Sequence, residues 1–196
     1  LTQGKVPEDC DTLIITSPES DFDDITTNAI IDYINKGGNI LWLNSAMARS
    51  IELPNINKIL TVYGINPFEV GVVRETDSSK IISNQPNIIM PEIQYADVTN
   101  KIYNSEGIIF INATKINVVD DTKLGELNVT KTDLITTSEN AYFRKDFTIT
   151  SDKAQTEEKQ ESILLGGKFE KTIGETTSTL IIYGENNFIS DYPLTK

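Results

Sequence analysis

Few side chains in this sequence are suited to catalysis. The 196 residues include one cysteine, Cys10, and no histidine. Histidine is the commonest general base and the commonest zinc ligand, so its absence removes most nucleophilic and zinc-dependent mechanisms. Cys10 stands between Asp9 and Asp11, and two neighbouring carboxylates make a thiol a weaker nucleophile. We therefore expect a structural or incidental cysteine, and no catalytic residue, cofactor or bound metal.

An acidic cluster is the next candidate for chemistry. Asp21, Asp23 and Asp24 follow the first apolar segment of the chain. Their oxygens could hold a cation, but they lack the alternating ligands and the distal glutamate of a calcium loop. A helix follows them, and aspartate is a preferred residue at a helix start. Helix capping is therefore the favoured interpretation of the cluster.

Polar residues also follow three apolar segments that resemble strands. Ser45 and Ser138 each stand where a hydrolase serine could sit, but neither lies in a G-x-S-x-G turn and no histidine can activate them. Glu185 and Asn186 follow the last apolar segment. Ligands of open α/β sheets bind beyond the carboxyl ends of the strands. These residues and the aspartates make a candidate interaction or ligand edge: Asp21, Asp23, Asp24, Ser45, Ser138, Glu185 and Asn186.

The elements that would position these residues begin with a strand–helix–strand unit. Residues 11–17 and 39–44 are apolar runs, and residues 25–34 carry apolar side chains at helical spacing. Gly37 and Gly38 follow the helix, where glycine supplies the left-handed terminus. Short connections of this kind predict two parallel strands joined by a crossover helix. The continuous apolar strands favour a sheet covered on both faces.

The rest of the chain is expected to be richer in strands. A second helix is predicted near residues 55–63, and residues 120–128 and 152–161 are predicted loops. The predicted strands are residues 68–73, 107–112, 115–119, 131–137, 162–171 and 179–184. We expect one domain over residues 1–196, with a β-rich subregion at 82–129.

The net charge of −12 limits the classes of partner. Nucleic acid is excluded as a partner because neutralising phosphates requires clustered lysine and arginine. The same charge disfavours docking on anionic lipid. The apolar runs are also far shorter than the roughly 20 residues that span a bilayer.

Five segments, taken in order, resemble a known family. They are Val6-Pro-Glu-Asp-Cys-Asp, Tyr33-Ile-Asn-Lys-Gly-Gly-Asn-Ile-Leu-Trp-Leu, Leu53-Pro-Asn-Ile-Asn-Lys-Ile-Leu, Thr136-Thr-Ser-Glu-Asn-Ala and Leu180-Ile-Ile-Tyr-Gly-Glu-Asn-Asn-Phe. This set is similar to the auxiliary domain of GldG-like ABC-transporter proteins, a family associated with gliding motility and with bacterial ABC export systems. The resemblance covers nearly the whole chain.

The resemblance implies a three-layer α/β domain, flavodoxin-like or class I glutamine-amidotransferase-like, with a mainly parallel sheet. It also implies a place on the extracytoplasmic face of the bacterial membrane, with tethering through segments absent from this chain. Only five residues precede Val6, where the family usually carries another strand and helix. We therefore expect an open sheet edge that could pair with another chain, including a second copy in a homodimer.

These observations lead to one main hypothesis and two alternatives. The main hypothesis is a non-catalytic extracytoplasmic module of a bacterial ABC-type export system, which binds the permease, a partner subunit or the cargo. One alternative is a domain that binds a sugar or cell-wall fragment in a cleft at the strand ends. The other is a degenerate amidotransferase-like hydrolase, which would require a nucleophile with a base in reach.

Overall fold

The structure, a computed structural model, describes residues 4–47, 52–104 and 107–187. It opens with the expected unit of β1 (Thr12–Thr16), α1 (Asp24–Asn35) and β2 (Asn39–Leu43). The two strands are parallel and in register from Thr12 opposite Asn39 to Thr16 opposite Leu43. The predicted parallel pair is therefore confirmed.

Local chemistry sets the two ends of α1. The side chain of Asp23 accepts a hydrogen bond of 2.7 Å from the backbone N–H of Thr26, which caps the first turn. Gly37 has a φ of +86° directly after the helix, a conformation that glycine adopts without steric cost. The chain can therefore turn at once into β2.

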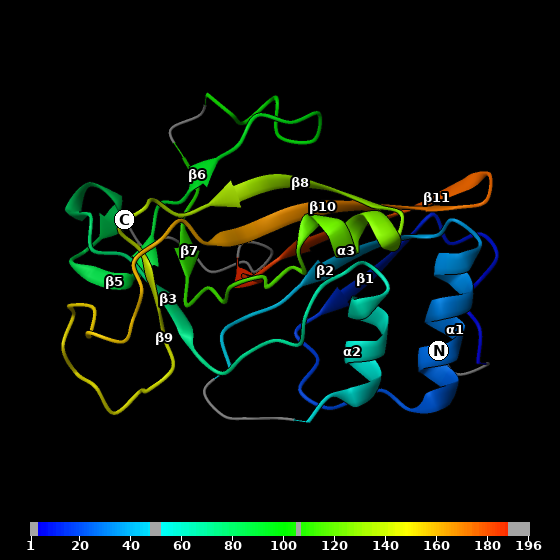
Figure 1. Cartoon of the computed structure of the whole chain (residues 1–196), viewed down its shortest axis with the longest axis horizontal. Helices are drawn as coiled ribbons and strands as arrows, with labels where there is room; N and C mark the ends of the chain where they lie inside the picture. The colour runs from blue at the N-terminus through cyan, green and yellow to red at the C-terminus, as the bar shows by residue number, and fades with distance from the viewer. Residues whose placement is uncertain (1–3, 48–51, 105–106, 188–196) are drawn as a thin grey trace.

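The main sheet has six strands and mixed directions (Figure 1). Its order is β1-β2-β11-β10-β8-β6, in which β1, β2 and β11 are parallel and the remaining pairs are antiparallel. The additional strands are β6 (Glu92–Ile93), β8 (Val129–Thr136), β10 (Leu164–Ile173) and β11 (Thr176–Tyr183). β11 therefore joins the N-terminal parallel pair to a C-terminal antiparallel region.

Short strands form two smaller sheets beside the main one (Figure 1). One pairs β3 with β9, and the other has the order β4-β5-β7. The bounds are β3 (Val72–Arg74), β4 (Ile81–Ile82), β5 (Gln85–Ile89), β7 (Phe110–Ile111) and β9 (Tyr142–Arg144), and the 3-10 turn η1 (Ser78–Lys80) lies between β3 and β4. This β-rich extension lies at the end of the molecule away from α1.

The interior consists of two apolar clusters. The first joins all three helices, α1, α2 (Pro54–Thr61) and α3 (Asp121–Glu126), to one face of the main sheet. Its members include Ile30, Ile34, Trp42, Ile56, Ile59, Leu124, Phe169 and Ile182. The second lies toward the smaller sheets and includes Val73, Ile89, Phe110, Leu134 and Leu165. Each cluster excludes water from one part of the main sheet.

The expectation of a three-layer flavodoxin-like or amidotransferase-like domain with a mainly parallel sheet is wrong. The described chain is mostly β, with mixed sheets and three helices whose buried side chains share one cluster. Ile14 of β1 points away from that cluster and is 60% exposed, so no second helix layer covers it. The prediction extended the strand–helix–strand pattern of β1, α1 and β2 to the whole chain. The strands after residue 64 are not joined by crossover helices of this kind.

Two local predictions also differ from the structure. Residues 115–119 form no strand, and Val118 makes only an isolated bridge to Ile65. The predicted loop at 120–128 contains α3, which begins where the Asp120 side chain accepts a 2.9 Å hydrogen bond from the N–H of Lys123. No helix among the described residues is long and apolar enough to cross a bilayer.

Candidate functional site

The carboxyl ends of β1, β2 and β11 meet at one edge of the main sheet. Leu43, near the end of β2, lies opposite Thr16 of β1 and Tyr183 of β11. The residues that follow these strands surround a pocket of about 580 Å³, which we call the strand-end pocket. Its lining is Ser17, Pro18, Glu19, Asn44, Ser45, Ala46, Met47, Leu53, Ile56, Phe68 and Asn186.

Ser17 links two other polar residues of the pocket lining, Asn186 and Ser45. Its hydroxyl accepts a 2.5 Å hydrogen bond from Nδ2 of Asn186 and lies 3.5 Å from the hydroxyl of Ser45. Its backbone has a φ of +33°, a value that is uncommon outside glycine. The N–H of Ser17 donates to the carbonyl of Leu43 at 2.7 Å. This backbone bond holds the turn, so the hydroxyl has a fixed position.

Asn44 differs from its polar neighbours. Its backbone N–H donates to the carbonyl of Tyr183 at 2.8 Å, which fixes it between β2 and β11. The residue is 6% exposed, yet its side-chain Nδ2 has no hydrogen-bond partner among the described residues. Buried amide groups nearly always have a partner, because leaving one unpaired costs about 1–3 kcal/mol. Asn44 therefore contributes a buried donor without a partner among the described residues.

The opposite wall of the strand-end pocket is apolar. Leu53 and Ile56 belong to the first core cluster, and Phe68 packs against it. Leu53 and Ile56 are held by the start of α2, whose first N–H groups are capped from a distant loop. Asp21 accepts hydrogen bonds from the N–H of Asn55 at 3.0 Å and from that of Ile56 at 2.9 Å. A polar rim thus faces an apolar wall.

The three aspartates expected at this edge serve the helices. Asp21 caps α2 and Asp23 caps α1. Hydrogen bonds from Thr26 lower the pKa of Asp23 below its ordinary value. Asp24 lies in the first turn of α1 and faces Lys58 across 3.8 Å, with both side chains exposed. No group of three potential metal-ligating side chains occurs among the described residues, so the cluster supplies caps.

The remaining expected site residues are dispersed. Ser45 and Asn186 line the strand-end pocket. Ser138 instead donates a 2.8 Å hydrogen bond to the buried carboxylate of Glu75. Glu185 is buried, and its side chain accepts a 2.9 Å hydrogen bond from the N–H of Asn187. Sequence reasoning missed Ser17 and Asn44, although both directly follow apolar strands and could have been found by that position.

A second pocket lies between the main sheet and the β-rich extension, and it is charged. It measures about 540 Å³, and we call it the charged pocket. Its lining includes Lys115, Asn117, Phe143, Lys145, Glu158, Lys159, Glu161 and Leu164. The lysines meet acidic partners at close range here, so the charges compensate one another.

Glu69, which lies beside the charged pocket, pairs with two of these lysines. Its carboxylate is 2.7 Å from Nζ of Lys115, pairs with Lys145, and accepts a 2.6 Å hydrogen bond from Nδ2 of Asn117. Partial burial opposes ionisation of Glu69, but hydrogen bonds from the two lysines outweigh it and lower its pKa to about 2. Lys115 also lies 4.6 Å from the ring centre of Phe143, a cation–π distance.

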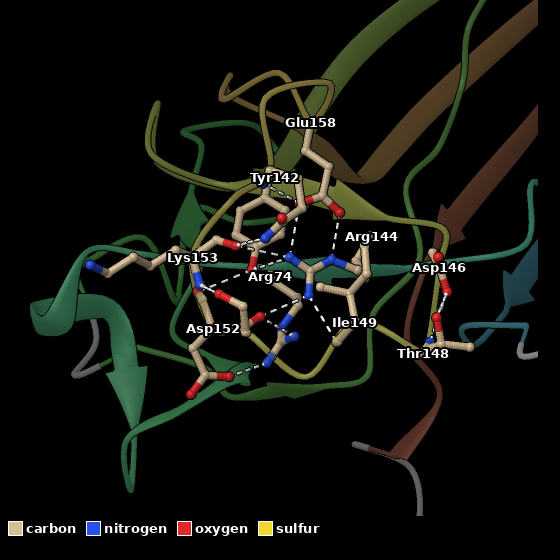
Figure 2. Close-up of polar contacts among 11 residues, drawn as sticks. Arg74, Tyr142, Arg144, Asp146, Thr148, Ile149, Asp152, Lys153 and Glu158 are labelled. Atoms are coloured by element: carbon tan, nitrogen blue, oxygen red, sulfur yellow. Dashed lines mark hydrogen bonds and ion pairs between the residues drawn. The ribbon is translucent and has the colours of Figure 1, made fainter.

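A buried arginine organises the loop that borders the charged pocket (Figure 2). Arg144 is 1% exposed and forms a two-point ion pair with Glu158, at 2.5 and 2.9 Å. Its remaining donors reach the hydroxyl of Tyr142 and the backbone carbonyls of Ile149, Ser151 and Lys153. The loop at 145–161 therefore folds around one guanidinium group. Burial opposes ionisation of Glu158, yet Arg144 holds its pKa below the ordinary value.

No arrangement for nucleophilic catalysis occurs in the described chain. Cys10 precedes β1, and its carbonyl accepts a 3.1 Å hydrogen bond from the hydroxyl of Tyr33. Ser17, Ser45 and Ser138 have hydroxyl, amide or carboxylate neighbours but no imidazole, because the sequence has no histidine. The two pockets present hydrogen-bonding groups and apolar side chains but no such catalytic pair.

A solved structure supports the observed architecture. A chain described as the mmIFT52 N-terminal domain superposes with a TM-score of 0.61 at 15% identity, covering 92% of this chain and 68% of that one. At this identity the likeness concerns the fold alone. No curated protein matches the sequence.

A family model matches residues 69–182, which run from just before β3 to the end of β11. It describes lipopolysaccharide assembly and LptC-related proteins. The resemblance to GldG-like ABC-transporter domains, with its implied link to gliding motility, is therefore wrong. At a general level the match agrees with a non-enzymatic, extracytoplasmic transport component of bacteria that works with transport partners. Because the match covers more than half of the sequence, this chain belongs to the LptC-related lipopolysaccharide-assembly family.

Proposed function

We propose that this chain is a non-catalytic, extracytoplasmic component of a lipopolysaccharide-type export assembly and that it acts by binding a partner subunit. The family match over residues 69–182 is the observation that carries this proposal. The absence of histidine supports a binding role because it removes the usual general base. The permease is one candidate partner within such an assembly.

The free edge of the main sheet supports a specific mode of binding. β1 is the terminal strand, and among the described residues only β2 pairs with it. Thr12, Ile14 and Thr16 of this strand are exposed. An exposed edge presents unpaired N–H and C=O groups, and an extended segment of another protein can add to it as a further strand. We infer that a strand of the partner subunit adds to β1.

Site-directed photocrosslinking in bacterial membranes tests both parts of the proposal. A photoreactive residue at Ile14 should form a product with a subunit of the export assembly. The matched control is Tyr95, which is similarly exposed but lies outside β1. Recovery of no transport subunit from either position would refute the transport role. A crosslink between two copies of the chain at Ile14 would instead indicate that β1 pairs with a second copy in a homodimer.

A further inference from the structure

We propose that residues 94–104, in the connection between β6 and β7, form a membrane-contact loop that inserts tyrosine and aliphatic side chains into the headgroup region of a zwitterionic lipid bilayer. We call this segment the aromatic loop. Figure 1 shows the connection between β6 and β7 extending outward beyond β8, away from α1 and α2. Binding to lipid requires no export subunit, so this proposal can fail or succeed independently of the transport role.

The aromatic loop exposes four large apolar side chains within nine residues. Tyr95 is 73% exposed, Val98 47%, Ile102 41% and Tyr103 45%. The rings of Tyr95 and Tyr103 lie 5.5 Å apart, edge to face. Outside this loop, exposed large apolar side chains of the described chain occur singly or, at positions 109 and 111, as a pair. A concentration of exposed apolar groups of this kind is typical of an interaction surface.

Inward-facing residues hold the loop so that these side chains remain in solvent. Ala96 belongs to the second core cluster. The hydroxyl of Thr99, a buried residue, donates a 2.5 Å hydrogen bond to the carbonyl of Gln94 and accepts one of 3.0 Å from the N–H of Ala96. The N–H groups of Ile102 and Tyr103 donate to the carbonyl of Thr99, each at 2.9 Å. A membrane would therefore meet a preformed turn.

The charge of the loop favours one class of lipid. Residues 94–104 contain one acidic and one basic side chain, Asp97 and Lys101, in a chain whose net charge is −12. Asp97 is compensated by Lys168 of β10 at 3.1 Å. Lys101 is exposed, and a lysine can hold its ammonium at a lipid phosphate while its methylene groups lie among apolar side chains. The nearly neutral loop fits a zwitterionic surface, whereas anionic lipid repels the acidic remainder of the chain.

The side chains of this loop suit a bilayer interface better than a protein partner. Tyrosine is enriched at the membrane–water boundary, because its ring is apolar while its hydroxyl stays hydrated. A specific protein interface buries roughly 800 Å² on each partner, and four side chains on a projecting loop are too few to supply that area. A bilayer accepts a few inserted side chains, and a second attachment adds to their effect.

Tryptophan fluorescence of the 196-residue chain with lipid vesicles tests the proposal. Trp42 is the single tryptophan and is fully buried, so its emission is a constant background. In Tyr95→Trp, phosphatidylcholine vesicles should move the emission to shorter wavelength, and phosphatidylcholine brominated in its acyl chains should quench it. Phe147→Trp is the matched control, because Phe147 is 48% exposed but lies outside the loop. Equal responses in the two variants, or none up to about 5 mM lipid, which detects millimolar affinity, would overturn the proposal.

The lipid composition separates insertion from electrostatic attraction. Replacing half of the phosphatidylcholine by phosphatidylglycerol should weaken the binding of Tyr95→Trp severalfold, because the acidic chain is repelled. Stronger binding to the mixed vesicles would show attraction by charge and overturn the proposal. An emission shift that grows with protein concentration in the absence of lipid would assign the loop to a contact between two copies of the chain and would also overturn it.

Further substitutions test whether the aliphatic side chains insert with the tyrosine. Adding Val98→Ser and Ile102→Ser to Tyr95→Trp should weaken vesicle binding at least about tenfold, because both side chains lose methyl or methylene groups that would enter the lipid. Val98→Ser alone should weaken binding about threefold, and it serves if circular dichroism shows that the combined change alters the fold. Unchanged binding in both variants would refute insertion of the loop.

Discussion

The charged pocket and the strand-end pocket are similar in size and opposite in chemistry. At the charged pocket, the lining residues Lys115, Lys145 and Asn117 all engage Glu69, which is not itself part of the lining. Close by, Arg144 uses its donors on Glu158, Tyr142 and three loop carbonyls. In the strand-end pocket, Asn44 is buried with an unpaired amide. The charged side chains of one region are thus paired within the fold, while a buried neutral amide in the other has no partner among the described residues.

This difference separates groups whose hydrogen bonds stabilise the fold from a group that makes no such bond. A group whose hydrogen bonds are already satisfied gains little from a new partner, and its existing bonds must break first. A buried group without a partner carries a cost in the free protein that binding removes. The comparison therefore predicts that changes in the charged region lower stability, whereas removal of the Asn44 amide costs little stability.

The largest expected effect follows from breaking the buried ion pair. Glu158→Gln leaves the charge of Arg144 buried without its carboxylate, which should lower the free energy of unfolding by about 3 kcal/mol or more. Asp152→Asn is the matched control in the same loop, because Asp152 pairs with Arg74 but is 65% exposed. That change should cost less than about 1 kcal/mol. Urea denaturation measures the free energy of unfolding of both variants. Equal losses would contradict the expectation that the buried pair of Arg144 and Glu158 contributes more than the exposed pair of Arg74 and Asp152.

The next effect is a loss of stability in acid that depends on Glu69. Its pKa is about 2 in the folded chain and 4.5 ordinarily. Between these values the unfolded state binds more protons than the folded state, so stability falls as the pH drops from 4.5 toward 2. The contribution should be roughly 1–2 kcal/mol, given its partial exposure to solvent.

Urea midpoints measured at several pH values between 7 and 3 should therefore fall less steeply in Glu69→Gln than in the original chain. Glu126→Gln provides the control, because Glu126 pairs with Lys123 on the surface. Parallel curves for the original chain and Glu69→Gln would disprove the role given to this carboxylate.

Two asparagines allow a paired side-chain amide to be compared with an unpaired one. Asn117 donates to Glu69 in the charged pocket, whereas the Asn44 amide donates to nothing in the described chain. Asn117→Leu should lower the free energy of unfolding by about 1.5 kcal/mol, because it removes a hydrogen bond to a charged group. Asn44→Leu should leave stability unchanged or raise it by up to about 1 kcal/mol, because it removes an unpaired buried donor. Thermal denaturation measures both changes, and similar losses in the two variants would contradict the distinction.

The smallest effects are expected at the aspartates beside the strand-end pocket. Asp21→Ala removes the cap of α2 and should cost about 1 kcal/mol. Asp24→Asn should change stability by less than about 0.5 kcal/mol, because this side chain is 81% exposed and its lysine partner lies 3.8 Å away. Calcium added to the original chain should not alter its thermal midpoint. A clear stabilisation by calcium would restore the cation-site interpretation.

The sequence predicted the N-terminal part of the fold well. The apolar runs and helical spacing located β1, α1 and β2, and the glycines after α1 located its end. These features depend on neighbours within a few residues, so a local pattern is sufficient. The mixed sheet could not be read in this way, because the position of β11 between β2 and β10 depends on contacts between residues far apart in sequence.

The candidate site was predicted only in part. Ser45 and Asn186 were chosen because they follow strands, and they do line one pocket. Ser138 follows β8, which is two strands away from β11 in the sheet, so it faces Glu75 instead. Asp21 was expected to serve the helix that follows it, but its carboxylate caps α2, more than thirty residues later. The position of Ser138 depends on the order of the strands, and the cap by Asp21 depends on the packing of α2 beside α1.

The sequence alone determined the chemistry that this chain lacks, since without histidine no fold can supply an imidazole base. It also determined the starts of α1 and α3, where Asp23 and Asp120 bond to the N–H groups of the turn that follows. Only the tertiary structure decided which polar groups are satisfied, as the contrast between Arg144 and Asn44 shows. The physical reason is that a buried hydrogen bond requires a partner in three dimensions, and that partner often comes from a distant part of the chain.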